Sequence, residues 1–247
     1  IYGLPHQTAE SFLDTLDKII AVGPERLSVF NYAHLPRRFM PQRRIDEDQL
    51  PPPQVKLEIL QATIERLTDA GWLYIGMDHF ARPDDELALA QRNGTLYRNF
   101  QGYSTHADCD LIGIGVTSIG KVGATYGQNR RELDEYYADI DAGHLPVFRG
   151  IELSRDDEIR RDVITRLICL FKLDFGEVER AWDLNFQDYF GRDLRKLEGM
   201  QADGLLEIDA SGEGPVGFRS DIWFGSGARL FRDGLEPGPL EDVLYLQ

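Results

Sequence analysis

The first part of the chain alternates between short apolar runs and amphipathic stretches. Residues 1–5 (IYGLP) are typical of a strand end followed by a turn. A helix is predicted from its N-cap residue Thr8 to about Val22, because apolar residues recur there at helical intervals. Residues 26–32 (RLSVFNY) favour a second strand. A strand, a helix and a strand joined by short loops predict a parallel βαβ unit.

The next stretch is predicted to contain one long loop and several short elements. Residues 35–53 form a polar loop that is rich in Pro, Arg and Asp. A helix is expected over residues 54–70, a strand over residues 73–80 (LYIGMDHF) and a short helix over residues 84–92.

An apolar run with spaced glycines, residues 110–119 (DLIGIGVTSI), predicts a buried strand, and residues 122–128 are expected to pair with it. Beyond this run the pattern becomes helical. The remaining predicted elements are helices over residues 131–142, 155–171, 177–182 and 186–200, and a short strand over residues 204–208.

This order of elements predicts an α/β fold with two domains. The first domain is expected over residues 1–143. The second, over residues 144–247, is a small helical domain, and its three helices followed by a strand suggest a winged-helix-like arrangement. Its last stretch, residues 210–247, is rich in Gly and Pro without sustained periodicity, so weak order is expected there.

Composition narrows the classes of function. The chain has 247 residues and a net charge of −15, which argues against a nucleic-acid or anionic-membrane partner, because such partners need a basic face. No apolar run is long enough for a membrane span, and no signal peptide is visible. The chain opens on Ile1 in what reads as a strand end, so we expect it to be truncated there. Its two cysteines, Cys109 and Cys169, cannot build a disulfide framework, which favours a reducing, cytoplasmic setting.

Several segments together resemble a known family. They are residues 1–5, 29–36 (VFNYAHLP), 74–81 (YIGMDHFA) and 98–103 (RNFQGY), the last leading into 110–120. In order and spacing they are similar to the oxygen-independent coproporphyrinogen III oxidases of the radical S-adenosylmethionine (SAM) superfamily. Residues 164–175 resemble the C-terminal helical domain of that family. The resemblance implies the C-terminal part of an incomplete radical-SAM (β/α) barrel, followed by the small helical domain.

The resemblance also implies a reaction and its cofactors. Family members decarboxylate coproporphyrinogen III to protoporphyrinogen IX in haem biosynthesis, with two SAM molecules, a 4Fe–4S cluster and an electron donor, and a monomer is expected. By resemblance, Ala33 contacts one SAM and Ile119 packs against the other. The family holds its cluster with three cysteines in a CxxxCxxC loop, which this chain lacks. We therefore expect the cluster ligands in sequence upstream of Ile1 and no activity from this chain alone.

Other polar residues have two interpretations each. His34, His79 and His106 lack the spacing of metal ligands, which disfavours a metal site. Asp78 and His79 either position the substrate or form a structural hydrogen-bonding pair. Residues 98–103, Gln101 among them, and the following Ser104 and Thr105 are expected to line the active site. Cys169 is interpreted as a core residue and Cys109 as inert.

A basic cluster in the long loop is also open to two interpretations. It could bind the four propionates of coproporphyrinogen, because guanidinium groups pair well with carboxylates. Alternatively, it is a solvated stretch with salt bridges to nearby acidic residues. The arginines are Arg37, Arg38, Arg43 and Arg44, and the acidic residues are Asp46, Glu47 and Asp48.

Two other functions remain as alternatives. A haem chaperone of the same superfamily shares the turn of residues 1–5, but the NYAHLP and RNFQGY segments favour the oxidase. A DNA-binding regulator is suggested by the winged-helix-like end, but the net charge of −15 speaks against it.

Overall fold

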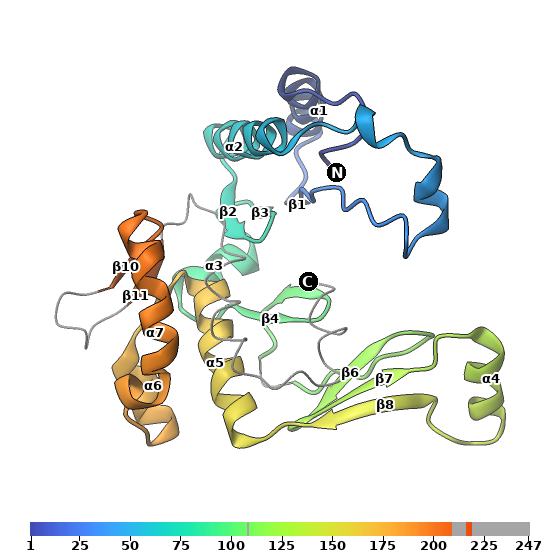
Figure 1. Ribbon diagram of the computed structural model, residues 1–247, viewed down its shortest axis with the longest axis vertical. Coiled ribbons are helices and arrows are strands. Elements are labelled where there is room, and N and C mark those ends of the chain that lie inside the picture. The colour runs from blue at the N-terminus through green and yellow to red at the C-terminus, as the bar shows by residue number, and fades with distance from the viewer. Residues whose placement is uncertain (108, 209–215, 219–247) are drawn as a thin grey trace. The chain divides into compact units, whose positions relative to one another are not determined.

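The computed structural model describes residues 1–107, 109–208 and 216–218, and the predicted weak order of residues 210–247 falls almost entirely outside them. The chain forms two compact units, Ile1–Thr95 and Leu96–Gln247 (Figure 1). The predicted domain division near residue 143 falls inside the second unit and stays a prediction. Within the described residues, no helix is long and apolar enough to cross a membrane.

The first unit packs two long helices beside a small sheet (Figure 1). Its hydrophobic core consists of residues from both helices and the strands around them, among them Phe12, Leu16, Ile59, Leu67, Trp72 and Phe80. Its elements are α1 (Ala9–Val22), β1 (Arg26–Ser28), the 3₁₀ helices η1 (Met40–Arg44) and η2 (Glu47–Gln49), α2 (Pro53–Asp69), β2 (Leu73–Gly76), β3 (His79–Ala81) and α3 (Glu86–Arg92).

The predicted cap of the first helix is confirmed. The Thr8 hydroxyl accepts a hydrogen bond from the Ser11 amide at 3.2 Å, and the Thr8 amide donates to the Ser11 hydroxyl at 3.0 Å. This capping box satisfies amides that would otherwise lack partners at the start of α1. Gly23 ends the helix in a left-handed conformation with φ 70°, which glycine adopts without steric penalty.

The predicted parallel pairing survives only as one bridge, between Tyr2 and Asn31. The strand expected over residues 26–32 shortens to β1, and the sheet has the order β1-β3-β2 with both pairs antiparallel. The fold is a mixed α/β one, as predicted, but the main partner of β1 is the hairpin strand β3.

The single strand predicted over residues 73–80 is wrong, because the chain reverses within it. Met77 and Asp78 both have positive φ, at 41° and 69°, and they form the two-residue turn of the β2–β3 hairpin. Positive φ at both turn residues matches the twist of paired strands, but it usually requires Gly or Asn. Apolar residues on both sides of this turn therefore resemble one continuous strand in the sequence.

The second unit contains three small sheets and four helices within its described residues. Its elements are β4 (Tyr97–Asn99), β5 (Gly102–Ser104), β6 (Ile119–Val122), β7 (Thr125–Asn129), α4 (Leu133–Asp141), β8 (Val147–Glu152), α5 (Arg155–Leu170), β9 (Lys172–Leu173), α6 (Phe175–Trp182), α7 (Phe186–Ala202), β10 (Leu206–Ile208) and β11 (Val216–Phe218). All the predicted helices are present. β8, which the apolar pattern did not predict, pairs antiparallel with β7.

The buried strand predicted over residues 110–119 is also wrong. Before Ile119, Leu111 alone pairs in this segment, through an isolated bridge to Lys121, and the residues that follow it form a loop. Ile112 and Ile114 are 69% and 85% exposed. The spaced glycines allow this loop, because a Cβ on Gly113 would lie 2.9 Å from the Ile119 carbonyl. Ile119 therefore begins β6, and β7 pairs with β6 instead of with the predicted strand.

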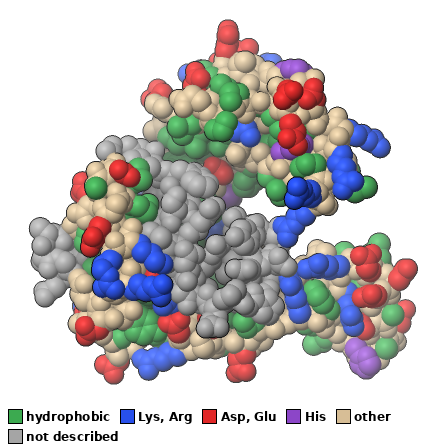
Figure 2. All heavy atoms as spheres, viewed as in Figure 1, with side chains coloured by type: hydrophobic (Ala, Val, Ile, Leu, Met, Phe, Trp, Pro, Cys, Tyr) green, Lys and Arg blue, Asp and Glu red, His purple; other side chains and the backbone are tan. Residues whose placement is uncertain are grey.

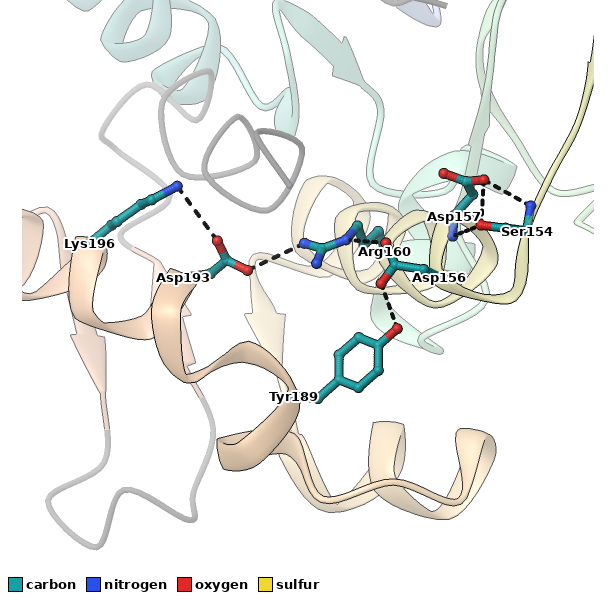
Figure 3. A network of polar contacts seen from close by, with 7 residues as sticks. All are labelled: Ser154, Asp156, Asp157, Arg160, Tyr189, Asp193 and Lys196. Atoms are coloured by element: carbon teal, nitrogen blue, oxygen red, sulfur yellow. Dashed lines mark hydrogen bonds and ion pairs between the residues drawn. The ribbon is translucent and has the colours of Figure 1, made fainter. Parts of the chain in front are cut away.

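The helical part of the second unit surrounds its apolar core and carries a polar network on one side (Figure 3). Arg160 of α5 reaches Asp156 one turn earlier at 2.8 Å and Asp193 of α7 at 3.3 Å. Lys196 also approaches Asp193, and Tyr189 donates to Asp156. Because Asp193 is almost fully buried, these contacts fix how α5 and α7 pack against each other.

Candidate substrate and cofactor site

The RNFQGY segment forms the β4–β5 hairpin of the second unit. The Asn99 side-chain oxygen accepts hydrogen bonds from the amides of Gln101, at 2.9 Å, and Gly102, at 3.3 Å, and so closes the turn. Gly102 has φ 141°, a conformation that glycine adopts readily. The Tyr103 hydroxyl donates to the Ile168 carbonyl at 3.0 Å, which anchors the hairpin on α5.

This hairpin lines a cavity of about 300 Å³, a volume at the lower end of the range for small-molecule sites. Its wall combines three aromatic rings with a polar rim. Phe100 and Tyr126 meet edge to face, with ring centroids 4.9 Å apart. The lining residues are Tyr97, Asn99, Phe100, Gln101, Ser104, His106, Cys109, Asp110, Leu111, Lys121 and Tyr126.

The polar side chains that line this cavity include the positively charged Lys121 and the negatively charged Asp110. The ammonium group of Lys121 lies 5.7 Å from the centroid of the Tyr97 ring, and burial raises the pKa of the Tyr97 hydroxyl. Asp110 accepts a hydrogen bond from the Gly123 amide at 2.9 Å. The cavity can therefore hold a ligand that has a flat ring together with charged or hydrogen-bonding groups.

The predicted site residue Ile119 lies on the same strand face as one wall of this cavity. Side chains two residues apart in a strand point the same way, so Ile119 and Lys121 share a face of β6. Ile119 is half-buried, and its strand partner is Gln128. The sequence had placed Ile119 at the end of a buried strand, whereas the structure places it at the start of β6.

The predicted site residue Ala33 lies in the first unit and is exposed. Its carbonyl accepts a hydrogen bond from the Gln42 side chain at 3.0 Å. Next to it, the His34 ring lies 3.1 Å from the Tyr32 hydroxyl through Nδ1 and 3.3 Å from a Glu47 carboxylate oxygen through Nε2. The contact with Tyr32 is a hydrogen bond, whereas the buried Nε2 atom makes none among the described residues and lies near Glu47 only.

Asp78 and His79 lie at the β2–β3 turn. The His79 Nδ1 atom is 2.7 Å from the Met77 carbonyl, which can only accept, so this nitrogen carries the proton. Burial and then the charge of Asp78 raise the pKa of Tyr74 to about 12, and both effects also raise the pKa of Tyr2. The His79 contact is the kind expected of a structural hydrogen-bonding role, and a role in positioning substrate stays a prediction.

The two cysteines differ sharply. Cys169 is fully buried, as predicted, and burial raises its pKa to about 12, with the nearby Arg98 opposing that shift. Cys109 is exposed and lines the cavity. A cluster held by three thiolates does not fit this chain, because the chain has only two cysteines. Within the described residues, no three His, Cys, Asp or Glu side chains are placed to hold a metal ion.

Comparisons with known proteins bear on both units. Residues 153–212 match the HemN C-terminal domain family. The chain is 56% identical over 212 residues to oxygen-independent coproporphyrinogen III oxidase of Escherichia coli and 55% identical to that of Pseudomonas aeruginosa. Each alignment covers 86% of this chain and 46% of the relative.

Over 212 residues the chain is similar to the oxygen-independent coproporphyrinogen III oxidases. A solved structure of coproporphyrinogen III oxidase (HemN) from Escherichia coli, described as a radical SAM enzyme, matches with a TM-score of 0.85 at 52% identity. That match covers 94% of this chain and 52% of the solved one, so the chain spans about half the length of the oxidases that it matches. The resemblance seen in the sequence is thereby confirmed.

Proposed function

We propose that this chain supplies part of the SAM- and substrate-binding surface of an oxygen-independent coproporphyrinogen III oxidase. The complete enzyme would convert coproporphyrinogen III to protoporphyrinogen IX in haem biosynthesis, using electrons from a separate donor. The observation that carries the proposal is the 56% identity over 212 residues to an enzyme of that name. The matching solved structure, described as a radical SAM enzyme, supports the same reaction class.

The proposal includes the finer architecture expected from the family. Residues 1–143 would belong to the incomplete radical-SAM barrel and residues 144–247 to the helical domain. The three helices α5, α6 and α7 beside the small sheet β10-β11-β9 support a winged-helix-like arrangement. The 4Fe–4S cluster would be held by a part of the enzyme outside this chain.

The chain's own residues would bind and orient the reactants. Ile119 offers an apolar surface beside the cavity, which suits the uncharged part of a nucleoside. The Ala33 carbonyl is already used by Gln42, so Ala33 would contact SAM through its amide or its methyl group. Gln101 lies on the cavity wall, and its backbone amide donates a hydrogen bond to the Asn99 side chain. Its side-chain amide would be offered to a ligand.

The proposal is tested with the complete enzyme, in which this chain is joined to an upstream segment that carries the CxxxCxxC loop. Under anaerobic reducing conditions with SAM, we expect protoporphyrinogen to form from coproporphyrinogen III. Gln101→Ala should reduce both turnover and SAM affinity, the latter measured by calorimetry without turnover. Gln61→Ala on α2, an exposed glutamine far from the cavity in sequence, is the matched control. Stoichiometric haem binding without decarboxylation would instead indicate a haem chaperone.

A further inference from the structure

The loop that includes η1 forms a basic surface on an acidic chain. Residues 33–45 contain four arginines and no acidic residue, although the whole chain has a net charge of −15. All four side chains are exposed, and Figure 2 shows Lys and Arg side chains gathered at the end of the first unit that this loop forms. The arginines are Arg37, Arg38, Arg43 and Arg44.

Among the residues that the structure describes, the acidic residues that follow make no ion pair with three of these arginines, Arg37, Arg43 and Arg44. Glu47 faces His34, and Asp46 accepts hydrogen bonds from the Asp48 amide, at 3.1 Å, and the Gln49 side chain as the cap of η2. The salt bridges expected for a solvated loop are therefore absent from these three arginines, which favours the alternative that the cluster binds an external anion.

The loop is held in shape before any ligand arrives. The Gln42 side chain accepts from the Leu35 amide at 2.5 Å and donates to the Ala33 carbonyl at 3.0 Å, so it closes the loop on both sides of His34. The Arg43 side chain donates to the Pro36 carbonyl at 3.0 Å through Nε, and its outer nitrogens remain available. A loop ordered in this way loses less conformational entropy on binding.

Apolar side chains lie among the arginines. Leu35, Phe39 and Met40 are 44%, 52% and 63% exposed. A ligand that matched this surface would have several carboxylates attached to an apolar ring. A tetrapyrrole with propionate side chains has this chemistry, because each carboxylate can pair with a guanidinium group and the macrocycle can cover the apolar residues.

We propose that Arg37, Arg43 and Arg44 bind the propionates of a tetrapyrrole polycarboxylate on this loop. The proposal rests on the proposed function for the identity of the ligand and adds where its carboxylates are held. Because Gln42 fixes both this loop and the Ala33 carbonyl, binding here would place the tetrapyrrole next to the predicted SAM contact of the same unit.

The test measures binding of coproporphyrin III, the stable oxidised form of the substrate, by fluorescence titration of the 247-residue chain. The variant R37Q/R43Q/R44Q should weaken binding about tenfold, the loss expected for a few exposed ion pairs. Coproporphyrin tetramethyl ester, which lacks the carboxylates, should bind wild type and variant equally weakly. Added salt should weaken binding of the acid to the wild type and leave the ester unchanged.

Two further variants separate charge from folding. K18Q/R192Q/R195Q also removes three positive charges, but at exposed positions outside the loop, and it should keep wild-type affinity for coproporphyrin III. R37K/R43K/R44K keeps the charges without the planar guanidinium groups and should recover part of the affinity. Because all these side chains are exposed, circular dichroism should show wild-type helix content in each variant.

Several outcomes would overturn the inference. One is an affinity for coproporphyrin III that is the same in R37Q/R43Q/R44Q and in the control, and another is tight binding of the ester. If the variant keeps its coproporphyrin affinity but slows reduction of the complete enzyme by an acidic electron-donor protein, the loop is a protein-docking surface instead. Arginine-dependent binding of coproporphyrin III by this chain, together with no decarboxylation of coproporphyrinogen III by the complete enzyme, would overturn the proposed function and leave this inference standing.

Discussion

Two regions of the second unit are held together in opposite ways. In the helical region of α5, α6 and α7, a core of ten buried apolar residues excludes water, with Phe175 stacked on Phe186 at 4.1 Å. In the region of β6, β7, β8 and α4, the buried residues are polar, namely Gln128 and Asn129, and α4 has no buried residue.

The polar region is braced by hydrogen bonds instead of apolar contacts. The Asn129 amide group reaches the carbonyls of Gly113, at 3.1 Å, and Gly115, at 3.0 Å, and the Ser118 hydroxyl at 3.0 Å. Apolar burial is nondirectional, whereas hydrogen bonds fix geometry. The comparison therefore suggests that the helical region supplies stability and the polar brace sets the shape of the loop that leads to Ile119.

The largest expected effect is on the helical core. Phe190→Ala should lower the free energy of unfolding by about 4 kcal/mol, because Phe190 is fully buried against Phe186 and its removal leaves a cavity. Urea denaturation followed by circular dichroism measures the loss. A loss below about 1 kcal/mol would mean that this core does not dominate the stability of the region.

A smaller and more local loss is expected from the brace. Asn129→Ala should cost about 2 kcal/mol, because it removes the shared donor to three acceptors. Hydrogen exchange should accelerate in residues 111–119 while the helices stay protected. Asn129→Asp keeps the size of the side chain but cannot donate, so it should behave like Asn129→Ala. If hydrogen exchange in residues 111–119 stays at the wild-type rate in both variants, the Asn129 hydrogen bonds do not hold this loop in place.

The third largest effect on the free energy of unfolding is expected at alkaline pH. The pKa of Cys169 is raised by burial from an ordinary value near 9 to about 12, so the folded state favours the neutral thiol. Its contribution to stability is complete below pH 9 and is lost as pH rises from 9 toward 12. In Cys109→Ala, stability should fall between pH 7 and pH 10 by about 1 kcal/mol more than in Cys109→Ala/Cys169→Ala. Equal losses in the two variants would show that Cys169 is not buried as a thiol.

The smallest effect is expected on α4. Leu133 is 59% exposed, so Leu133→Ala should change the free energy of unfolding by less than about 0.5 kcal/mol. The same denaturation experiment as for Phe190→Ala measures it. A loss as large as that of Phe190→Ala would show that α4 is packed against a partner and would remove the contrast between the regions.

Helices were predicted from the sequence more successfully than strands were. Each predicted helix has a cap or an apolar stripe in its own sequence, as Thr8 illustrates. Residues 73–80 and 110–119 are both largely apolar, but their paths depend on backbone turns at Met77 and Asp78 and at residues 115–117. Apolar content does not reveal where such turns occur.

The candidate site shows the same limit. The resemblance singled out residues 98–103 as a site segment, and Asn99, Phe100 and Gln101 do line the cavity. Lys121, Asp110 and Tyr126 were missed, because they reach the cavity only through the β6–β7 hairpin and the chain reversal before it. The two hydrogen bonds by which Gln42 closes its loop could not be predicted either. A single glutamine in a polar loop looks like any solvent-exposed residue.

Selection for heat resistance is expected to change the turn at Met77 and Asp78, with a side effect on nearby electrostatics. Both residues hold a backbone conformation that glycine adopts more easily, so a library ranked by melting temperature should be enriched in glycine at these positions. A glycine at position 78 would also delete the negative charge that raises the pKa of Tyr2 and Tyr74. Engineers who improve this turn would therefore alter the electrostatics of the first unit at the same time.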